Sequence, residues 1–100
     1  MRKGYRAEYK AKKELIEKYG KENILKIAIG GAVDFLVLDP KRNKIKKIVE
    51  VKKTSKKKYY PKPREKIQLQ RLEELGKRHK IPIELWIKYS RNDFVKKKLI

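Results

Sequence analysis

The sequence predicts a single α/β domain, residues 1–100, in which helices flank a mixed sheet. Segments with helical spacing alternate with short segments of period-two apolar pattern. No repeat, linker or change of composition divides the chain, and 100 residues suffice for one modest core. A strand that follows a helix can lie parallel to an earlier strand through a right-handed crossover. The expected elements are a helix over 3–19, an antiparallel meander of strands over 23–29, 33–39 and 48–52, a helix over 64–79, and a strand from 82 onward.

The first helix is predicted to end at Gly20 and to bury one stripe of side chains. Glu8 lies at helical spacing from the apolar members of this stripe, so we expect its carboxylate to face the protein. The apolar members of the stripe are Tyr5, Ala11, Leu15, Ile16 and Tyr19.

Two acidic residues interrupt otherwise apolar strands, Asp34 in the second and Glu50 in the third. A buried carboxylate is costly unless a cation or a donor meets it. The hairpin register that matches apolar faces pairs Leu36 with Ile48, and it sets Asp34 directly opposite Glu50. Lys52 shares the face of Glu50 because side chains alternate along a strand.

Like charges opposite each other in a sheet repel, and a divalent cation between them converts the repulsion into coordination. Mg²⁺ is the expected ion, and Mn²⁺ is expected to substitute for it. Lys52 would hold a water molecule or a phosphate oxygen near this ion. The alternative interpretation is an ordinary hairpin with a solvated polar edge.

The composition favours a polyanionic partner. Lys and Arg number 31 against 12 Asp and Glu, which gives a formal net charge of +19. DNA or RNA is the first candidate partner and an anionic membrane surface the second. No apolar run approaches a membrane span and no signal peptide is recognisable, so we expect a cytoplasmic protein without a membrane partner. Cysteine is absent, which excludes disulfides and thiolate metal sites.

The order of Glu8, Asp34 and Glu50-x-Lys52 resembles that of the PD-(D/E)xK nuclease superfamily, which shares the restriction-endonuclease core. Within that superfamily, residues 3–9 (KGYRAEY) and 31–38 (GAVDFLVL) resemble archaeal Holliday junction resolvases. The sequence departs from the family pattern in two places. Val33 replaces the proline of the family name, and residues 27–31 lack the resolvases' arginine and serine.

The resemblance implies a Mg²⁺-dependent DNA endonuclease that favours branched or junction DNA and forms a homodimer. Asp34, Glu50 and the main-chain carbonyl of Val51 would be metal ligands, and Lys52 would orient the attacking water. Glu8 would reach the metal directly or through a bound water.

Gln68, on the second helix, is the best match to a glutamine that supports the site in some branches of the superfamily. It shares a helical stripe with Leu72, Leu75 and His79, so it is expected to face the protein.

Basic and aromatic residues gather at the start of the first helix and after Lys52, where they are candidates for nucleic-acid contacts. Positive charge at a helix start opposes the macrodipole, and a phosphate partner would explain it, as would a simple basic surface. The segment after Lys52 is alternatively a solvated loop. The candidate residues are Arg2, Lys3, Arg6, Lys53, Lys56, Lys57, Lys58, Tyr59 and Tyr60.

Two questions stay open from the sequence. The apolar residues Phe94, Val95, Leu99 and Ile100 either cap the core or join a twofold partner. The function is alternatively a nuclease acting on other DNA or RNA substrates, or a non-catalytic basic nucleic-acid-binding protein. The second alternative leaves Asp34 opposite Glu50 without a reason.

Overall fold

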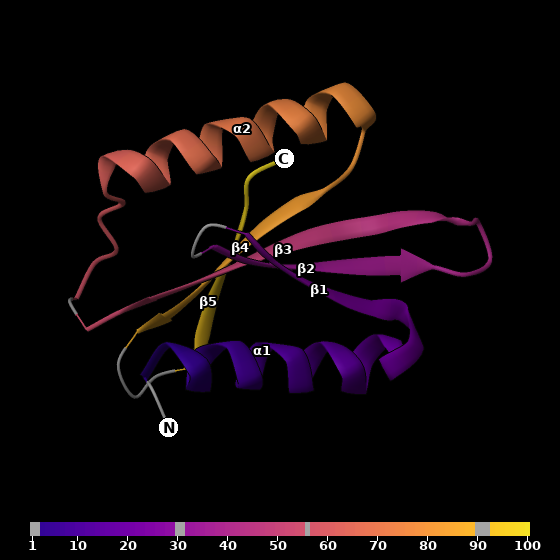
Figure 1. Cartoon of the computed structure of the whole chain (residues 1–100), viewed down its shortest axis with the longest axis horizontal. Helices are drawn as coiled ribbons and strands as arrows, with labels where there is room; N and C mark the ends of the chain where they lie inside the picture. Colours follow the sequence, from indigo (N-terminus) through magenta and orange to yellow (C-terminus); the bar gives the residue numbers. More distant parts are fainter. Residues whose placement is uncertain (1–2, 30–31, 56, 90–92) are drawn as a thin grey trace.

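A five-stranded mixed sheet lies between two helices in the computed structural model (Figure 1). The structure describes residues 3–29, 32–55, 57–89 and 93–100, except for the side chains of 3–6, 28–29 and 32–34. The elements are α1 (Lys3–Tyr19), the 3-10 helix η1 (Lys21–Asn23), β1 (Ile24–Ile29), β2 (Ala32–Asp39), β3 (Lys44–Thr54), α2 (Pro63–His79), β4 (Ile83–Tyr89) and β5 (Phe94–Lys98).

The strands lie in sequence order across the sheet. β1, β2 and β3 form an antiparallel meander, β4 pairs with β3 in parallel, and β5 is antiparallel to β4. α1 covers one face and α2 the other (Figure 1). The predicted α/β class, the meander and the parallel fourth strand are confirmed.

The predicted hairpin register is also confirmed. Asp34 pairs with Glu50, Phe35 with Val49 and Leu36 with Ile48, and a bulge follows at Val37/Leu38. A slip by one residue would turn Phe35, which is fully buried, away from the core. Apolar patterning therefore fixes the backbone partner of Glu50.

The main core lies between α1 and the sheet. Ala7, Ala11 and Leu15 of α1 are buried against strand residues that include Phe35 and Trp86. Small alanines let the helix approach the sheet closely. The expected burial of Ala11 and Leu15 is confirmed, whereas Ala7 was not anticipated.

The remaining members of the predicted stripe are less deeply buried. Ile16 and Tyr19 are half-buried, and the side chain of Tyr5 lies outside the described residues.

The α2 helix contacts the sheet along a different line from the one predicted. Gln68 and Leu72 are half-buried and Gly76 is buried, which is a strict spacing of four residues. The predicted inward orientation of Leu75 and His79 is wrong, since both are exposed. Because glycine has no side chain, α2 can approach the sheet most closely at Gly76. This close contact sets the rotation of α2 about its own axis.

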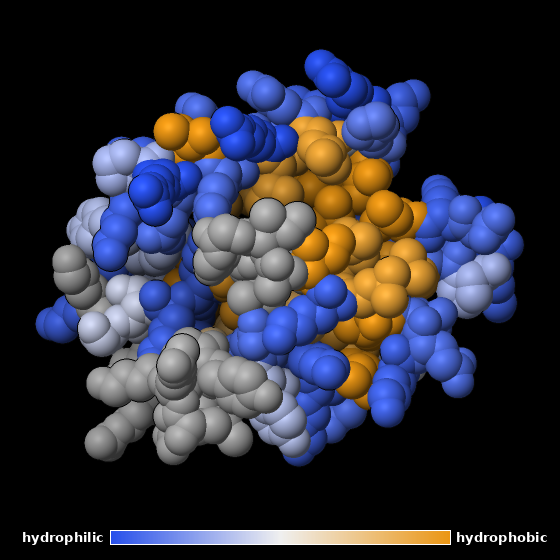
Figure 2. Space-filling view, in the orientation of Figure 1, coloured by the Kyte–Doolittle hydropathy of each residue, from blue (hydrophilic) through white to orange (hydrophobic). Residues whose placement is uncertain are grey.

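Apolar atoms are visible between α2 and the sheet on one face of the molecule (Figure 2). Leu25 of β1 and Ile67 of α2 are each half exposed. The α2 side of the sheet is therefore covered less completely than the α1 side.

We expect the substitution Gly76→Ala to destabilise the protein. An added Cβ would lie 2.7 Å from Ile83 Cγ1, 2.8 Å from Ile100 Cδ1 and 2.8 Å from the Ile81 carbonyl oxygen. Overpacking of this kind costs about 1–3 kcal/mol, more than the roughly 1 kcal/mol that alanine gains over glycine inside a helix. Urea unfolding measures the difference. The exposed neighbour substitution Lys77→Ala is the control, and equal stability of the two variants would contradict the packing argument.

The structure corrects several predicted boundaries. β1 begins one residue later than expected because Asn23 belongs to η1. β3 is longer than the predicted strand, and it includes Lys53 and Thr54, which were expected in a loop. α2 begins at Pro63, a favoured first helical position.

The fifth strand was not predicted. Phe94 packs on Trp86 with ring centroids 5.5 Å apart, and the amides of Leu99 and Ile100 both donate to the Ile83 carbonyl oxygen. Phe94, Leu99 and Ile100 therefore cap the core, which was one of the two alternatives, whereas Val95 is exposed. Three of the five residues of β5 are lysines, as is common in edge strands, so the segment lacks the alternating apolar pattern that predicts a strand.

Candidate metal centre

Glu50 lies in the middle of β3, and only 1% of its side chain is exposed. Its strand neighbours are Asp34 of β2 and Leu85 of β4. Within the described part of the chain, neither carboxylate oxygen accepts a hydrogen bond. A buried charge in this state needs a cation.

Lys52 supplies one cation. Its Nζ lies 2.8 Å from Glu50 Oε1, an ion pair whose angles are not those of a hydrogen bond. The Lys52 side chain is 12% exposed, and its ammonium also donates to Gln68 Oε1 at 3.3 Å. The predicted inward position of Gln68 is confirmed. The sheet and α2 therefore hold Glu50, Lys52 and Gln68 together.

The backbone of Asp34 lies opposite that of Glu50, as predicted, while its side chain lies outside the described residues. Val51 is buried, and its side chain belongs to the core under α1. Val51 follows Glu50 directly in β3, and its backbone pairs with Val33 on one side and with Trp86 on the other.

Glu8 takes part in a separate ion pair. Its carboxylate lies 3.1 Å from the ammonium of Lys26 on β1, and the side chain of Glu8 is 14% exposed. Lys26 pairs with Phe35, so it belongs to the α1 face of the sheet, opposite the face of Glu50. The described contacts thus join Glu50, Lys52 and Gln68 and place Glu8 with Lys26.

The candidate nucleic-acid residues are only partly described. Lys57, Lys58 and Tyr60 are exposed on the segment that leads to α2, and Lys53 is half-buried in β3. Predictions for the structure around Arg2 and Lys56, and for the side chains of Lys3 and Arg6, lie outside the described residues.

Tyr59 has a role that the sequence did not reveal. Its hydroxyl donates to the carboxylate of Glu65, in the first turn of α2. Gln68 lies one helical turn further along, so this hydrogen bond anchors the end of α2 that carries Gln68. Burial, together with the hydrogen bond and the negative charge of Glu65, raises the pKa of Tyr59 well above its ordinary value of 10.0.

We expect the substitution Tyr59→Phe to lower the free energy of unfolding by roughly 1–2 kcal/mol, because a half-buried hydrogen bond to a charged group is lost. A raised pKa favours the protonated phenol in the folded state. The stability that this raised pKa contributes is complete at pH values below the pKa of Tyr59 in the unfolded state. It is lost as the pH rises toward the pKa of Tyr59 in the folded state. Urea unfolding above pH 10 should therefore show a steeper loss of stability in the parent than in the variant. Parallel curves would contradict this.

A polar cluster on the α1 face was also not evident from the sequence. Lys47 of β3 and Glu84 of β4 form an ion pair at 3.1 Å, with side chains 10% and 20% exposed. The available signal was the alternation that places Lys47 on the face of the buried Val49. Glu84 lies 37 residues further along the chain than Lys47, so no local pattern identifies it as the partner of Lys47.

The arrangement around Glu50 suits a hard divalent cation. Carboxylate and main-chain oxygens are the ligands that Mg²⁺ accepts, and it binds with few protein ligands while keeping water. Among the side chains that the structure describes, which do not include Asp34, no three His, Asp or Glu groups form a metal cluster. The candidate centre therefore rests on the buried Glu50 and on its backbone partner Asp34.

Neither described helix combines the length and the apolar character needed to cross a membrane. Comparison with known proteins finds no matching family model, curated protein or solved structure.

Proposed function

We propose that this chain is a Mg²⁺-dependent DNA endonuclease of the PD-(D/E)xK type, similar to Holliday junction resolvases and selective for branched DNA. One observation carries the proposal. Glu50 is a fully buried carboxylate without a hydrogen bond from the described residues, it lies 2.8 Å from an ammonium, and its backbone partner is a second acidic residue.

Asp34, Glu50 and the Val51 carbonyl would hold the ion, and Mn²⁺ would take the place of Mg²⁺. When bound, such an ion polarises the phosphate and lowers the pKa of a coordinated water. Among the described residues, the Glu50 carboxylate accepts no hydrogen bond and forms an ion pair with Lys52 alone. Coordination of a metal ion would satisfy these oxygens.

Lys52 is the proposed water-orienting group. An ammonium has three donors, and Gln68 accepts from this one, which fixes its direction. Gln68 is thus a positioning residue, and Tyr59 supports it through Glu65. Glu8 pairs with Lys26 on the face of the sheet opposite that of Glu50, so the described contacts do not support the part that the resemblance implies for it.

The net charge of +19 supports DNA as the substrate class. The exposed Lys57, Lys58 and Tyr60 lie on the segment between β3 and α2, the two elements that form the candidate site. Phosphate contacts release counterions, so affinity should fall steeply as salt rises.

Cleavage assays test this function. Purified protein is incubated with four-way-junction DNA, linear duplex, single-stranded DNA and RNA, each with Mg²⁺, Mn²⁺ or EDTA. We expect cutting of the junction with either metal ion and none with EDTA. Cutting that survives EDTA would contradict the metal mechanism, and equal cutting of all substrates would contradict selectivity. Binding without cutting under every metal would identify a non-catalytic nucleic-acid-binding protein.

We also propose that the protein is a homodimer, as the resemblance implies. Light scattering during size-exclusion chromatography at high salt measures the mass. A value near the monomer mass of 12.0 kDa would contradict this part of the proposal.

A further inference from the structure

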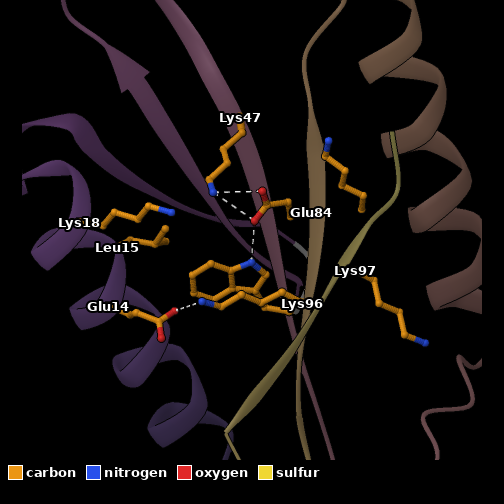
Figure 3. Close-up of a pocket in the computed structure, with 9 residues that line it drawn as sticks. Glu14, Leu15, Lys18, Lys47, Glu84, Lys96 and Lys97 are labelled. Carbon is orange, nitrogen blue, oxygen red and sulfur yellow. Dashed lines mark hydrogen bonds and ion pairs between the residues drawn. The ribbon is translucent and has the colours of Figure 1, made fainter.

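A small polar pocket opens on the α1 side of the sheet, between α1 and β5 (Figure 3). Its volume is about 240 Å³, below the roughly 300–1,000 Å³ of pockets that enclose drug-sized ligands. A small group of atoms therefore fits it better than a large ligand. The lining residues are Glu14, Leu15, Lys18, Lys47, Glu84, Trp86 and 96–98.

The floor of the pocket is a fixed hydrogen-bonded network. Both carboxylate oxygens of Glu84 accept from Lys47 Nζ at 3.1 Å, and Oε1 also accepts from Trp86 Nε1 at 2.9 Å. Glu84 is thus well satisfied, and its negative charge and the two hydrogen bonds that it accepts from Lys47 hold that ammonium in place. A preorganised ammonium binds an anion without the entropy cost of ordering a free lysine.

The rim adds further positive charge. Lys96 Nζ lies 4.3 Å from the centre of the Trp86 ring and 2.7 Å from Glu14 Oε2. Lys18 points toward the cavity from α1, whereas Lys97 points away from it (Figure 3). Lys98 shares the strand face of Lys96 by alternation. Four lysines then face two glutamates, which leaves a formal excess of two positive charges.

Tyr19 does not line the pocket, but two of the pocket's lysines, Lys18 and Lys47, lie against its ring. The ammonium groups of Lys18, Lys46 and Lys47 lie 5.0–5.3 Å from its ring centre. Burial by itself raises the pKa of Tyr19, but hydrogen bonding and charge from Lys47 and Lys18 outweigh burial and lower it. The ammonium groups of Lys18 and Lys47 therefore create a positive field that favours negative charge on a neighbouring oxygen.

This pocket is separate from the candidate metal centre. Lys47, Glu84 and Trp86 share the sheet face of Val49, whereas Glu50 and Lys52 lie on the opposite face. We propose that the pocket between α1 and β5 binds a phosphate group. The phosphate is that of a nucleic-acid backbone or a free phosphate compound. The site does not depend on whether Glu50 supports cleavage.

Trp86 provides a direct readout, because it is the single tryptophan of the chain and lines the pocket. Its fluorescence is followed during titration with inorganic phosphate, pyrophosphate and a short single-stranded oligonucleotide, each at constant ionic strength set with chloride. We expect a saturable change with phosphate or pyrophosphate, and none when chloride alone is varied. Competition by the oligonucleotide would assign the phosphate to a nucleic-acid backbone, and its failure to compete would assign it to a free phosphate compound.

Two matched variants test the location. Lys18→Gln removes a charge at the pocket, and Lys12→Gln removes one at another exposed position of α1. We expect Lys18→Gln to weaken phosphate binding by roughly tenfold or more, as for the loss of one charge-assisted hydrogen bond, and Lys12→Gln to leave it unchanged. Equal effects of the two variants, or no saturable signal in the parent, would overturn the proposal.

Discussion

Replacing Lys52 by methionine is expected to reduce DNA cleavage by roughly 10²–10³-fold, the usual cost of removing one preorganised hydrogen-bond donor from a reaction site. Methionine preserves most of the volume of the side chain but removes the ammonium that lies between Glu50 and Gln68. Binding to DNA should change little, because the other 30 of the 31 Lys and Arg residues remain. Single-turnover cleavage and equilibrium binding to the same junction separate the two effects.

Two controls accompany this variant. Lys66→Met removes a charge from an exposed position of α2 and should cut like the parent. Lys52→Arg keeps a cation beside Glu50, and therefore the fold, but a guanidinium differs in shape and stays protonated, so cleavage should still fall. Parental activity in both Lys52 variants would show that Lys52 has no role in the chemistry.

The second large effect concerns stability. Removing one partner of a buried ion pair costs about 3–5 kcal/mol, whereas replacing both by apolar residues is neutral or stabilises by about 1–4 kcal/mol. Lys52→Met alone leaves Glu50 fully buried without its cation, so it should be strongly destabilised. Glu50→Leu alone should lower the free energy of unfolding by less, because Lys52 keeps its hydrogen bond to Gln68 and its partial exposure to solvent. The double variant should be at least as stable as the parent.

Urea unfolding of the four proteins forms a double-mutant cycle that measures this coupling. Repeating it with Mg²⁺ tests the metal centre without any activity assay. An ion that binds only the folded state raises its stability by RT ln(1 + [L]/Kd), so Mg²⁺ should stabilise the parent and not the double variant. Additive single effects would contradict the coupling of Glu50 with Lys52, and equal Mg²⁺ responses would contradict a metal centre at Glu50.

The hairpin that carries the candidate site was predictable because its information is local. Alternation along β2 and β3 assigns each side chain to a face, and only one register matches the apolar faces. The pairing of Asp34 with Glu50, and the shared face of Glu50 and Lys52, follow from that register. The burial of Ala11 and Leu15 was predictable for a similar reason, since helical spacing brings them to one stripe.

The orientation of α2 was not predictable from spacing. Leu75 and His79 share a stripe with Gln68, yet they are exposed, because Gly76 allows a closer contact with Ile83 and Ile100 than any larger residue. Those two partners come from β4 and from the end of the chain. The rotation of this helix therefore depends on residues that follow it in the sequence.

By itself, the amino-acid sequence determined the α/β class, the meander, the hairpin register and the acidic pair within it, because strand and helix periodicities act over a few residues. Only the tertiary structure decided which face of α2 touches the sheet, that β5 closes the edge, and that Lys47 meets Glu84. These contacts join residues distant in sequence. Their geometry depends on how β3, α2 and β4 pack together, which no local pattern encodes.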